Sequence, residues 1–409
     1  MELTRNQGLR GALPRLLWPL PAIASCVVGL TFWQTGRWSV LGVPLGERHF
    51  GDLRIVTTTA ECAAADPSWN INSFPCAPEA AIYNYPSIWA QILGRLNVDR
   101  THTDLIAAAL IIIFAITLGY LTRVVCQRGA GWLALLVMSA CGLSPAVLLA
   151  FERGNIDVLV YAVLVLGLAL STRRKARAAG AFLGLATGLK LFPIGAVCAL
   201  FIDRPVRKAA VLLFVAVGGV GLALAARDFS LISSRTPLLD GAAFGAAELP
   251  LLVANQMSLG ANANVIRAVG LLGFVAVLAL ILLASRLAPR NHFSAALSQL
   301  TVSLQSDRIA SILVLGGGGA FVVAYLAGPS FDYRLIFLIP CVAGLLILQT
   351  RAANTAALLL TLQLILSYST FVGSAQYLSD LMLLILVPGL TVILWRVSKS
   401  GSRDAVAVV

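Results

Sequence analysis

Charged residues are scarce in this sequence, and their scarcity excludes an ordinary soluble protein. Asp, Glu, Lys and Arg make up only 12% of the 409 residues, whereas soluble domains carry roughly 25%. Hydrophobic residues make up 59% of the chain, and apolar runs long enough to cross a bilayer recur along it. The sequence therefore predicts an all-α polytopic membrane protein, because helices satisfy their own backbone hydrogen bonds in lipid.

Several other signatures are missing. There is no alternation of apolar and polar residues with period two, which argues against a membrane β-barrel. The three histidines and seven cysteines stand at no spacing typical of a tight metal site. Walker loops, dinucleotide-binding glycine loops and a nucleophile elbow are also absent. We therefore expect neither a metal nor a bound cofactor.

Basic residues recur in alternate connections between the apolar runs and account for the net charge of +12. They are Arg5, Arg10, Arg15, Arg123, Arg128, Arg173, Arg174, Lys175, Arg177, Arg204, Arg207, Lys208, Arg286, Arg290, Arg351, Arg396, Lys399 and Arg403. The other connections hold most of the acids. This pattern follows the positive-inside rule. It places both termini in the cytoplasm of a bacterium and gives no reason to expect a nucleic acid.

Ten apolar segments are expected to cross the membrane within a single domain, 1–409. They are 14–34, 104–122, 131–151, 156–171, 208–226, 267–286, 309–328, 335–350, 355–372 and 379–396. Two longer connections, 35–103 and 227–267, then lie on the outer side. Cys62 and Cys76 both fall in the first of these outward loops. Because that compartment is oxidising, they form either a disulfide or two free thiols.

The apolar segment 179–202 is exceptional. The basic sequence RRKAR precedes it and RPVRK follows it, so a crossing here would invert the charge bias of every later loop. Lys190 and Pro193 stand at its midpoint, and proline breaks a helix. We expect a re-entrant helical hairpin buried in protein, with eleven crossing helices as the alternative. A role for Lys190 on the outer side requires this hairpin to reach deep into the bundle.

Polar side chains gather in five stretches that this topology places on the outer side. They comprise Asp52 and Arg54; Tyr83 and Tyr85; Glu152, Arg153, Asn155 and Asp157; Asn255 and Gln256; and Asp332, Tyr333 and Arg334. Charged residues at the edge of a span usually face the bundle or a wet cavity. One polar cavity would gather all five stretches. Taken singly, they are also consistent with a solvated acid, an interfacial aromatic belt, a hairpin ion pair and a snorkelling arginine.

This combination suits sugar transfer from a lipid-phosphate donor. A carboxylate accepts the proton of an acceptor hydroxyl. Arginine and lysine hold the leaving phosphate and neutralise its developing charge. Aromatic rings stack on sugar faces. The sequence thus predicts a transferase, while a transporter or flippase of a lipid-linked sugar would use the same lipid contacts without a base. A structural partner in an envelope-assembly complex would need no polar constellation.

The stretch ERGNIDVLVYAVLVLGLAL, a basic turn and AGAFLGLATGLKLFPI together resemble the central signature of glycosyltransferase family 87. This family comprises polyprenyl-phosphate-mannose-dependent α-mannosyltransferases of the GT-C superfamily. The matching residues are Arg153, Gly154, Asn155, Gly184, Leu185, Lys190 and Pro193. YNYPSIW and NQMS resemble two further family stretches, and Asp52 stands where the superfamily carries its general base. The chain departs from the family in Leu53, Arg54 and Ile55 after the aspartate, in Ser87, and in Asp157 and FDYR.

The resemblance implies a GT-C-like bundle of about ten transmembrane helices plus the re-entrant hairpin. The implied enzyme is an inverting, metal-independent transferase that moves mannose from a polyprenyl-phosphate donor to a hydroxyl of a cell-envelope glycolipid or glycan. Asp52 is then the general base, and Arg334, Lys190 and, as a third choice, Arg54 contact the donor phosphate. The remaining residues bind substrate or arrange the site: Tyr83, Tyr85, Glu152, Arg153, Asn155, Asn255, Gln256, Asp332 and Tyr333.

Overall fold

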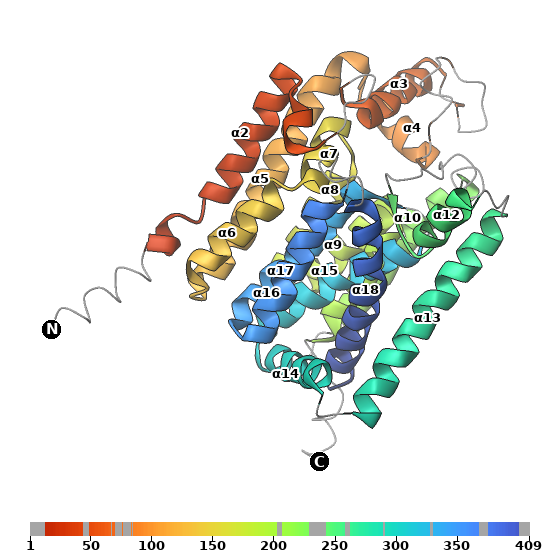
Figure 1. The fold of residues 1–409 in the computed structure, drawn as a ribbon. Coiled ribbons are helices and arrows are strands. Elements are labelled where there is room, and N and C mark those ends of the chain that lie inside the picture. Colours follow the sequence, from red (N-terminus) through yellow and green to blue (C-terminus); the bar gives the residue numbers. More distant parts are fainter. Residues whose placement is uncertain are drawn as a thin grey trace.

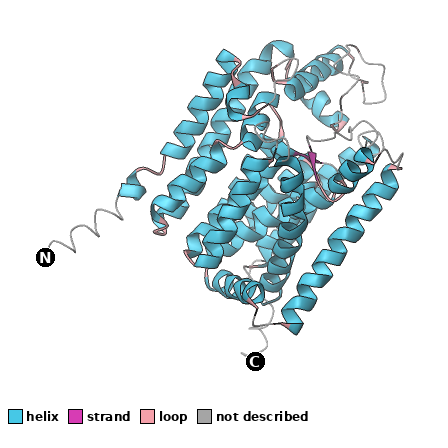
Figure 2. Cartoon of the chain, viewed as in Figure 1, coloured by secondary structure: helices cyan, strands magenta, loops and turns pink. Residues whose placement is uncertain are grey.

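A computed structural model describes residues 13–43, 49–66, 68–69, 76, 83, 85–202, 207–228, 243–257, 262–288, 291–327, 330–367 and 375–400. This part of the chain is almost entirely helical (Figure 2). Within it, two strands of two residues each, β1 (Ala243–Phe244) and β2 (Ser330–Phe331), pair antiparallel. The all-α prediction is confirmed.

Six helices of the described chain are long and apolar enough to cross a membrane. They span Arg100–Gln127, Gly131–Arg153, Arg207–Ala225, Val265–Leu287, Arg308–Leu326 and Tyr377–Ser398. The predicted polytopic character is therefore supported, but the count of ten spans is not confirmed. Three further segments predicted to cross form helices of 16 residues, which at 1.5 Å per residue reach only about 24 Å.

An N-terminal group of helices forms one side of the bundle (Figure 1). They are α2 (Leu20–Thr35), α5 (Thr103–Gln127), α6 (Gly131–Gly142), α7 (Pro145–Arg153) and α8 (Asp157–Thr172). Ser25 of α2 donates a hydrogen bond to the carbonyl of Gly142 at 2.8 Å. The contact joins α2 to the end of α6, so the first helix is anchored in the bundle.

The centre of the bundle contains the segment predicted as a hairpin. Helix α9 (Ala176–Leu189) ends at Lys190, whose backbone is extended, and the 3-10 helix η4 (Phe192–Phe201) follows. Helix α9 packs closely on α10 (Arg207–Ala225). A Cβ at Gly184 would lie 2.7 Å from the Phe214 carbonyl oxygen, and one at Gly188 would lie 3.1 Å from Gly221 Cα. Gly184 of the family signature is therefore a packing residue.

These contacts also fix the direction of the chain. Gly180 meets Ala210, Gly184 meets Phe214 and Gly188 meets Gly221, so α9 and α10 run parallel. The intervening η4 must therefore return the chain to the end at which α9 begins. It does so against α15 (Arg308–Leu326), where the backbones of Gly195 and Gly319 meet. How deeply this segment lies in a membrane stays a prediction.

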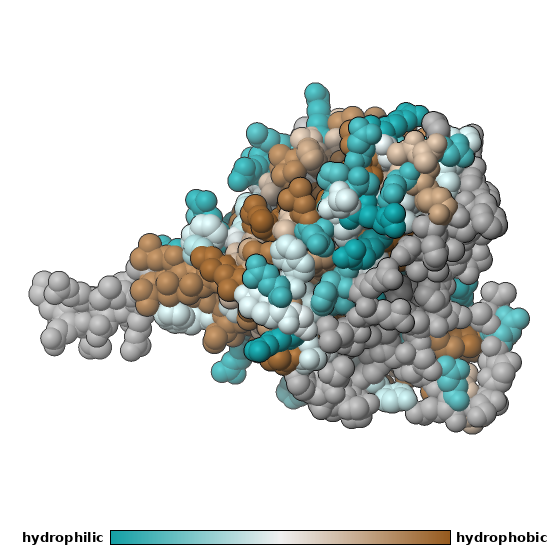
Figure 3. Space-filling model, turned by 90° about the horizontal axis from the view of Figure 1, so that it is seen from above, coloured by the Kyte–Doolittle hydropathy of each residue, from teal (hydrophilic) through white to brown (hydrophobic). Residues whose placement is uncertain are grey.

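Helices α3 (Gly51–Ala65) and α4 (Ser87–Arg95) lie across the upper end of the bundle in Figure 1. Short 3-10 helices flank them at Trp38–Leu41 (η1) and Arg100–His102 (η3). A disulfide joins Cys62 of α3 to Cys76, with 5.7 Å between their Cα atoms. Seen from above, hydrophilic side chains gather on this face (Figure 3). We call it the upper end.

The C-terminal half completes the bundle and its opposite, lower end. It contains η6 (Ala226–Asp228), α12 (Glu248–Gln256), α13 (Ala263–Leu287), α14 (His292–Ser306), η7 (Asp332–Phe337), α16 (Leu338–Leu348), α17 (Arg351–Leu366) and α18 (Ala375–Ser400). Helix α14 lies across the lower end (Figure 1). The buried core is continuous through α15 and α16, whose apolar side chains face neighbours on every side.

Candidate active site

The site begins at the tight connection between α7 and α8. Helix α7 ends at Arg153, and Gly154 closes it with a left-handed backbone, φ 60°. Asn155 follows, fully buried, and its Oδ1 accepts a hydrogen bond from the Asp157 amide at 2.8 Å. This bond starts α8 directly after the turn, so four polar residues are fixed within one short connection.

Asp52 docks on this turn from helix α3. It lies in the first turn of α3, and the preceding Phe50 amide donates to the Glu152 carbonyl at 2.8 Å. Asn155 Nδ2 donates to Asp52 Oδ2 at 2.5 Å. A Cβ at Gly154 would lie 3.0 Å from Leu53 Cβ, which shows how closely α3 approaches. The glycine is needed both for its positive φ and for this contact.

Two cations meet one buried acid beside Asp52. Lys190 Nζ lies 2.5 Å from Asp157 Oδ1, and Arg334 Nε donates to Asp157 Oδ2 at 3.1 Å. The Asp157 side chain is fully buried, and the two cations are 13% and 18% exposed. One carboxylate neutralises only one of the two charges. These three side chains together therefore carry one net positive charge, which suits a phosphate, and Asp52 lies within electrostatic range of Lys190.

The hairpin carries Lys190 into this cluster, as its predicted role requires. Lys190 stands at the turn between α9 and η4. This turn therefore lies next to Asp157, the first residue of α8. Arg334 arrives from η7 and lies over the ring of Phe192, with 5.4 Å from its Cζ to the ring centroid. Three segments distant in sequence thus supply the cluster.

Aromatic rings form another wall. Lys190 Nζ lies 4.8 Å from the centroid of the Tyr85 ring, a favourable cation–π distance. Tyr85 packs on Tyr83, whose hydroxyl donates to the Pro86 carbonyl at 2.9 Å. Tyr333 is 4% exposed and lies within electrostatic range of Asp52 and Tyr85. Tyr85 and Tyr333 therefore face the same cluster.

The surroundings make the Asp52 carboxylate more basic. Exclusion of water raises the pKa of Asp52 above its ordinary value. The hydrogen bond from Asn155 and the charges of Arg153 and Lys190 lower that pKa, but by less. The residue is nevertheless only partly buried. A carboxylate that is both accessible and more basic than usual suits a general base.

Two predicted residues beside the cluster have partners of their own. Glu152 is fully buried, and its Oε2 lies 3.2 Å from Arg153 Nε, as expected for an acid that pairs with a cation. Arg54 donates from Nε to the His49 carbonyl at 2.9 Å, and its Nη2 lies 3.7 Å from Asp104 Oδ1. Arg54 is therefore engaged at the rim, which makes it a weaker candidate for the phosphate than Lys190 or Arg334.

Three further predicted residues are not found in the cluster around Asp157. Asn255 is exposed on α12, and the side chain of Gln256 lies outside the described residues. Asp332 is fully buried, and its electrostatic neighbours are Asp380 and Glu248. Exclusion from water and, to a smaller extent, these two acids raise the pKa of Asp332 well above its ordinary value. The substrate-binding roles of these three residues stay predictions.

Two residues that the sequence did not single out also shape the site. Phe192 supplies the ring under Arg334. Asp228 accepts a hydrogen bond from the Ser87 amide at 2.7 Å and so ties η6, which follows α10, to the start of α4. Phe192 adjoins Pro193 of the family signature, which could have drawn attention to it. Asp228 carries no comparable signal in the sequence.

Comparison with known proteins supports one family. Neither the curated proteins nor the solved structures give a significant match. The sequence model of glycosyltransferase family 87 matches residues 101–315, more than half of the chain. The matched region includes the α7–α8 turn and Lys190, while Asp52 and Arg334 lie outside it. The chain therefore belongs to glycosyltransferase family 87 and is a glycosyltransferase embedded in the membrane.

Proposed function

We propose that this enzyme moves mannose from a polyprenyl-phosphate donor to a hydroxyl of a cell-envelope glycolipid or glycan, with inversion at the sugar. The observation that carries the proposal is the meeting of Asp52 with the Lys190–Asp157–Arg334 cluster. A carboxylate made more basic faces a group of side chains with surplus positive charge. General base and phosphate site thus lie side by side, as this reaction requires.

The steps follow from these positions. Asp52 accepts the proton of the acceptor hydroxyl, and the oxygen of that hydroxyl attacks the anomeric carbon. The bond between this carbon and the phosphate oxygen breaks, and its electron pair leaves with the polyprenyl phosphate. Lys190 and Arg334 neutralise the charge that develops on the phosphate, because charge-assisted hydrogen bonds from such donors are strong. Asn155 keeps the Asp52 carboxylate in place.

The charge pattern supports a site on the outer side of the membrane with both termini in the cytoplasm. The basic turn between α8 and α9 and the start of α10 belong to the end at which α9 begins. Asp52 and Lys190 lie at the other end. The positive-inside rule assigns the basic end to the cytoplasm. The proposed acceptor is therefore a molecule of the periplasm or outer leaflet.

The decisive experiment measures sugar transfer by purified protein in nanodiscs. Radiolabelled polyprenyl-phosphate mannose is offered with a panel of glycolipid and glycan acceptors. We expect Asp52→Asn to lower turnover by about 10²- to 10⁴-fold, the usual contribution of general base catalysis, while donor binding is retained. Asp104→Asn is the matched control, because Asp104 is exposed near the same end of the molecule and pairs with Arg54.

Two outcomes would contradict the proposal. Full activity in Asp52→Asn would move the base to another acid. Donor binding by the wild type without transfer to any acceptor would favour a carrier of lipid-linked sugar. A second variant tests the phosphate contact separately. Arg334→Gln leaves Lys190 and Asp157 as a balanced pair, so the fold should survive while donor affinity falls by roughly 10- to 100-fold.

A further inference from the structure

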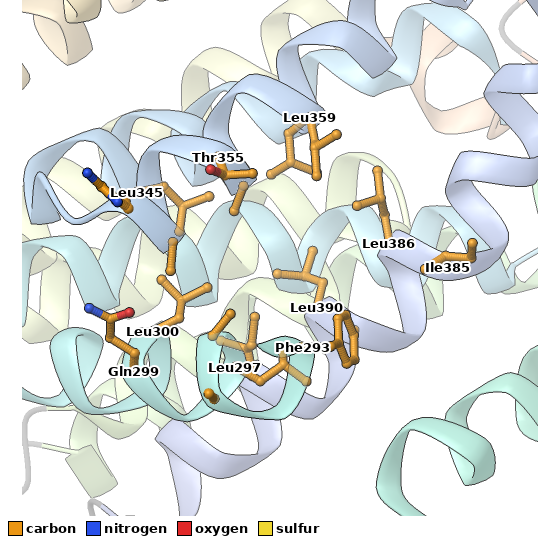
Figure 4. Close-up of a pocket in the computed structure, with 18 of the residues that line it drawn as sticks. Phe293, Leu297, Gln299, Leu300, Leu345, Thr355, Leu359, Ile385, Leu386 and Leu390 are labelled. Carbon is orange, nitrogen blue, oxygen red and sulfur yellow. The ribbon is translucent and has the colours of Figure 1, made fainter. Parts of the chain in front are cut away.

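A long apolar groove opens at the lower end of the bundle, remote from the candidate active site. It lies between α14, α17 and α18 and encloses about 530 Å³. Leu297 and Leu300 of α14, Leu359 of α17, and Leu386 and Leu390 of α18 project into it (Figure 4). Its lining is mostly aliphatic. Exposure of such an apolar surface to water is unfavourable, so an apolar ligand is favoured in the groove.

Helix α18 explains why the groove is not filled. Pro388 stands inside this helix, where proline removes a backbone hydrogen bond and bends the axis. Gly389 follows and lines the groove, and a Cβ added there would meet no atom within 4 Å. Ala352 and Ala356 line the opposite wall on α17. Small side chains on both walls leave a channel where larger ones would close the interface.

The two ends of the groove differ in polarity. Ile385 and Leu386 lie toward one end, and Gln299 lies toward the other (Figure 4). Arg351, which also lines the groove, is the first residue of α17 and is exposed. Among the described residues no ion pair involves Arg351. Among the described lining residues, Arg351 is the one arginine or lysine, and it stands at the end of an otherwise mostly apolar groove that also includes His292.

The dimensions fit one leaflet of a bilayer. Leu359 lies eight residues after Arg351 on α17, which corresponds to about 12 Å along the helix. Half of a hydrocarbon core of roughly 30 Å is slightly longer than this. Two further basic residues precede and follow α14 in the chain: Arg286 in the last turn of α13 and Arg308 at the start of α15. The chemistry is that of a lipid with its negative headgroup at the membrane surface and its chain along the groove.

We propose that the groove between α14, α17 and α18 binds one anionic phospholipid, with an acyl chain over Gly389 and the phosphate at Arg351. The site is separate from the donor site at the upper end and does not depend on which sugar is moved. The lipid fills the space beside Gly389, where an added Cβ would meet no atom within 4 Å.

The test uses the full-length protein, delipidated in detergent and titrated with phosphatidylglycerol or phosphatidylcholine of the same acyl chains, with bound lipid read by native mass spectrometry. We expect one phosphatidylglycerol per chain, bound about fivefold more tightly than phosphatidylcholine, since one basic residue contributes about this much to anionic lipid binding. Arg351→Gln should abolish this preference. Gly389→Leu should remove both lipids, because its side chain fills the channel.

Gly219→Leu on α10 is the matched control, because a Cβ there also meets no atom within 4 Å and the residue does not line the groove. Ala356→Leu fills the channel from the other wall and replaces Gly389→Leu if the latter does not fold. Equal binding of the two lipids by the wild type, or unchanged phosphatidylglycerol binding in both filling variants, would overturn the proposal. So would a dimer that these variants convert to monomer without changing bound lipid, because the groove would then hold a second copy.

Discussion

At the upper end of the bundle Asp157 has no exposed surface and is held between Lys190 and Arg334, whereas at the lower end Gly389 faces space that no side chain fills. The first is rigid because a buried charge must be paired wherever it stands. The second can keep unfilled space because its apolar side chains need neither hydrogen bonds nor counter-charges. Substitutions should therefore have large, specific effects above and small, graded effects below.

The largest effect is expected from Asp157→Ala. The substitution leaves Lys190 and Arg334 close together without their carboxylate, and breaking a buried pair in this way costs about 3–5 kcal/mol of folding free energy. Denaturant unfolding in detergent micelles measures it. Asp104→Ala, which breaks an exposed pair, should change stability by no more than about 1 kcal/mol. Equal losses in the two variants would remove the contrast between buried and exposed pairs.

A smaller loss is expected from Gly154→Ala. The left-handed backbone costs an alanine about 1–2 kcal/mol, and its Cβ would also press on Leu53 and Phe50. Gly131→Ala isolates the first effect, because Gly131 has a φ of 61° and a Cβ there meets nothing within 4 Å. The difference in melting temperature between these two variants reports how tightly α3 docks on the turn. No difference would mean that the docking is loose.

The pH dependence of transfer tests the environment of Asp52. As a base, Asp52 must be deprotonated, so kcat/KM falls as the pH drops through its pKa. Because that pKa is raised, the acidic limb should lie above the ordinary value of about 3.9. Asn155→Ala removes a hydrogen bond that lowers the pKa, so the limb should move to still higher pH. A limb that moves down would mean that another group titrates.

The smallest effect, and one of opposite sign, is expected from Gly389→Ala. Glycine inside a helix is about 1 kcal/mol less favourable than alanine, and the new methyl group meets no neighbour. The variant should therefore be slightly more stable in the same unfolding assay. A loss of stability would show that the helix beside Pro388 needs the glycine, and the lower end would then be as constrained as the upper one.

Much of the candidate site was predictable from residue type and order. The charge bias of the loops placed Asp52, Asn155 and Arg334 at one end of the bundle, and the structure brings them to a common cluster. Lys190 was identified because a lysine in an apolar segment needs a partner. The identity of that partner, Asp157, was not predicted, since hydrophobic periodicity gives the buried face of a helix and not the residue opposite it.

The count of spans was less predictable for a physical reason. Apolar composition indicates that a helix is buried. It does not distinguish a helix surrounded by protein from one surrounded by lipid. The segment predicted as a span at 335–350 is divided between the 3-10 helix η7 and α16, which has 11 residues, nearly all buried in the bundle. Asp332 and Asn255 could not be placed either, because their positions depend on how distant helices pack.

The contact between Arg334 and Asp157 also sets a condition on biosynthesis. The two residues are 177 positions apart, which a ribosome that adds 5–20 residues per second covers in roughly 10–35 s. During that interval Asp157 has only Lys190 as its cationic partner in the cluster, and η7 has not yet emerged. A chain that stops early therefore presents a balanced ion pair without surplus charge. Under the proposed function, only the completed polypeptide then carries the net positive charge that binds the donor phosphate.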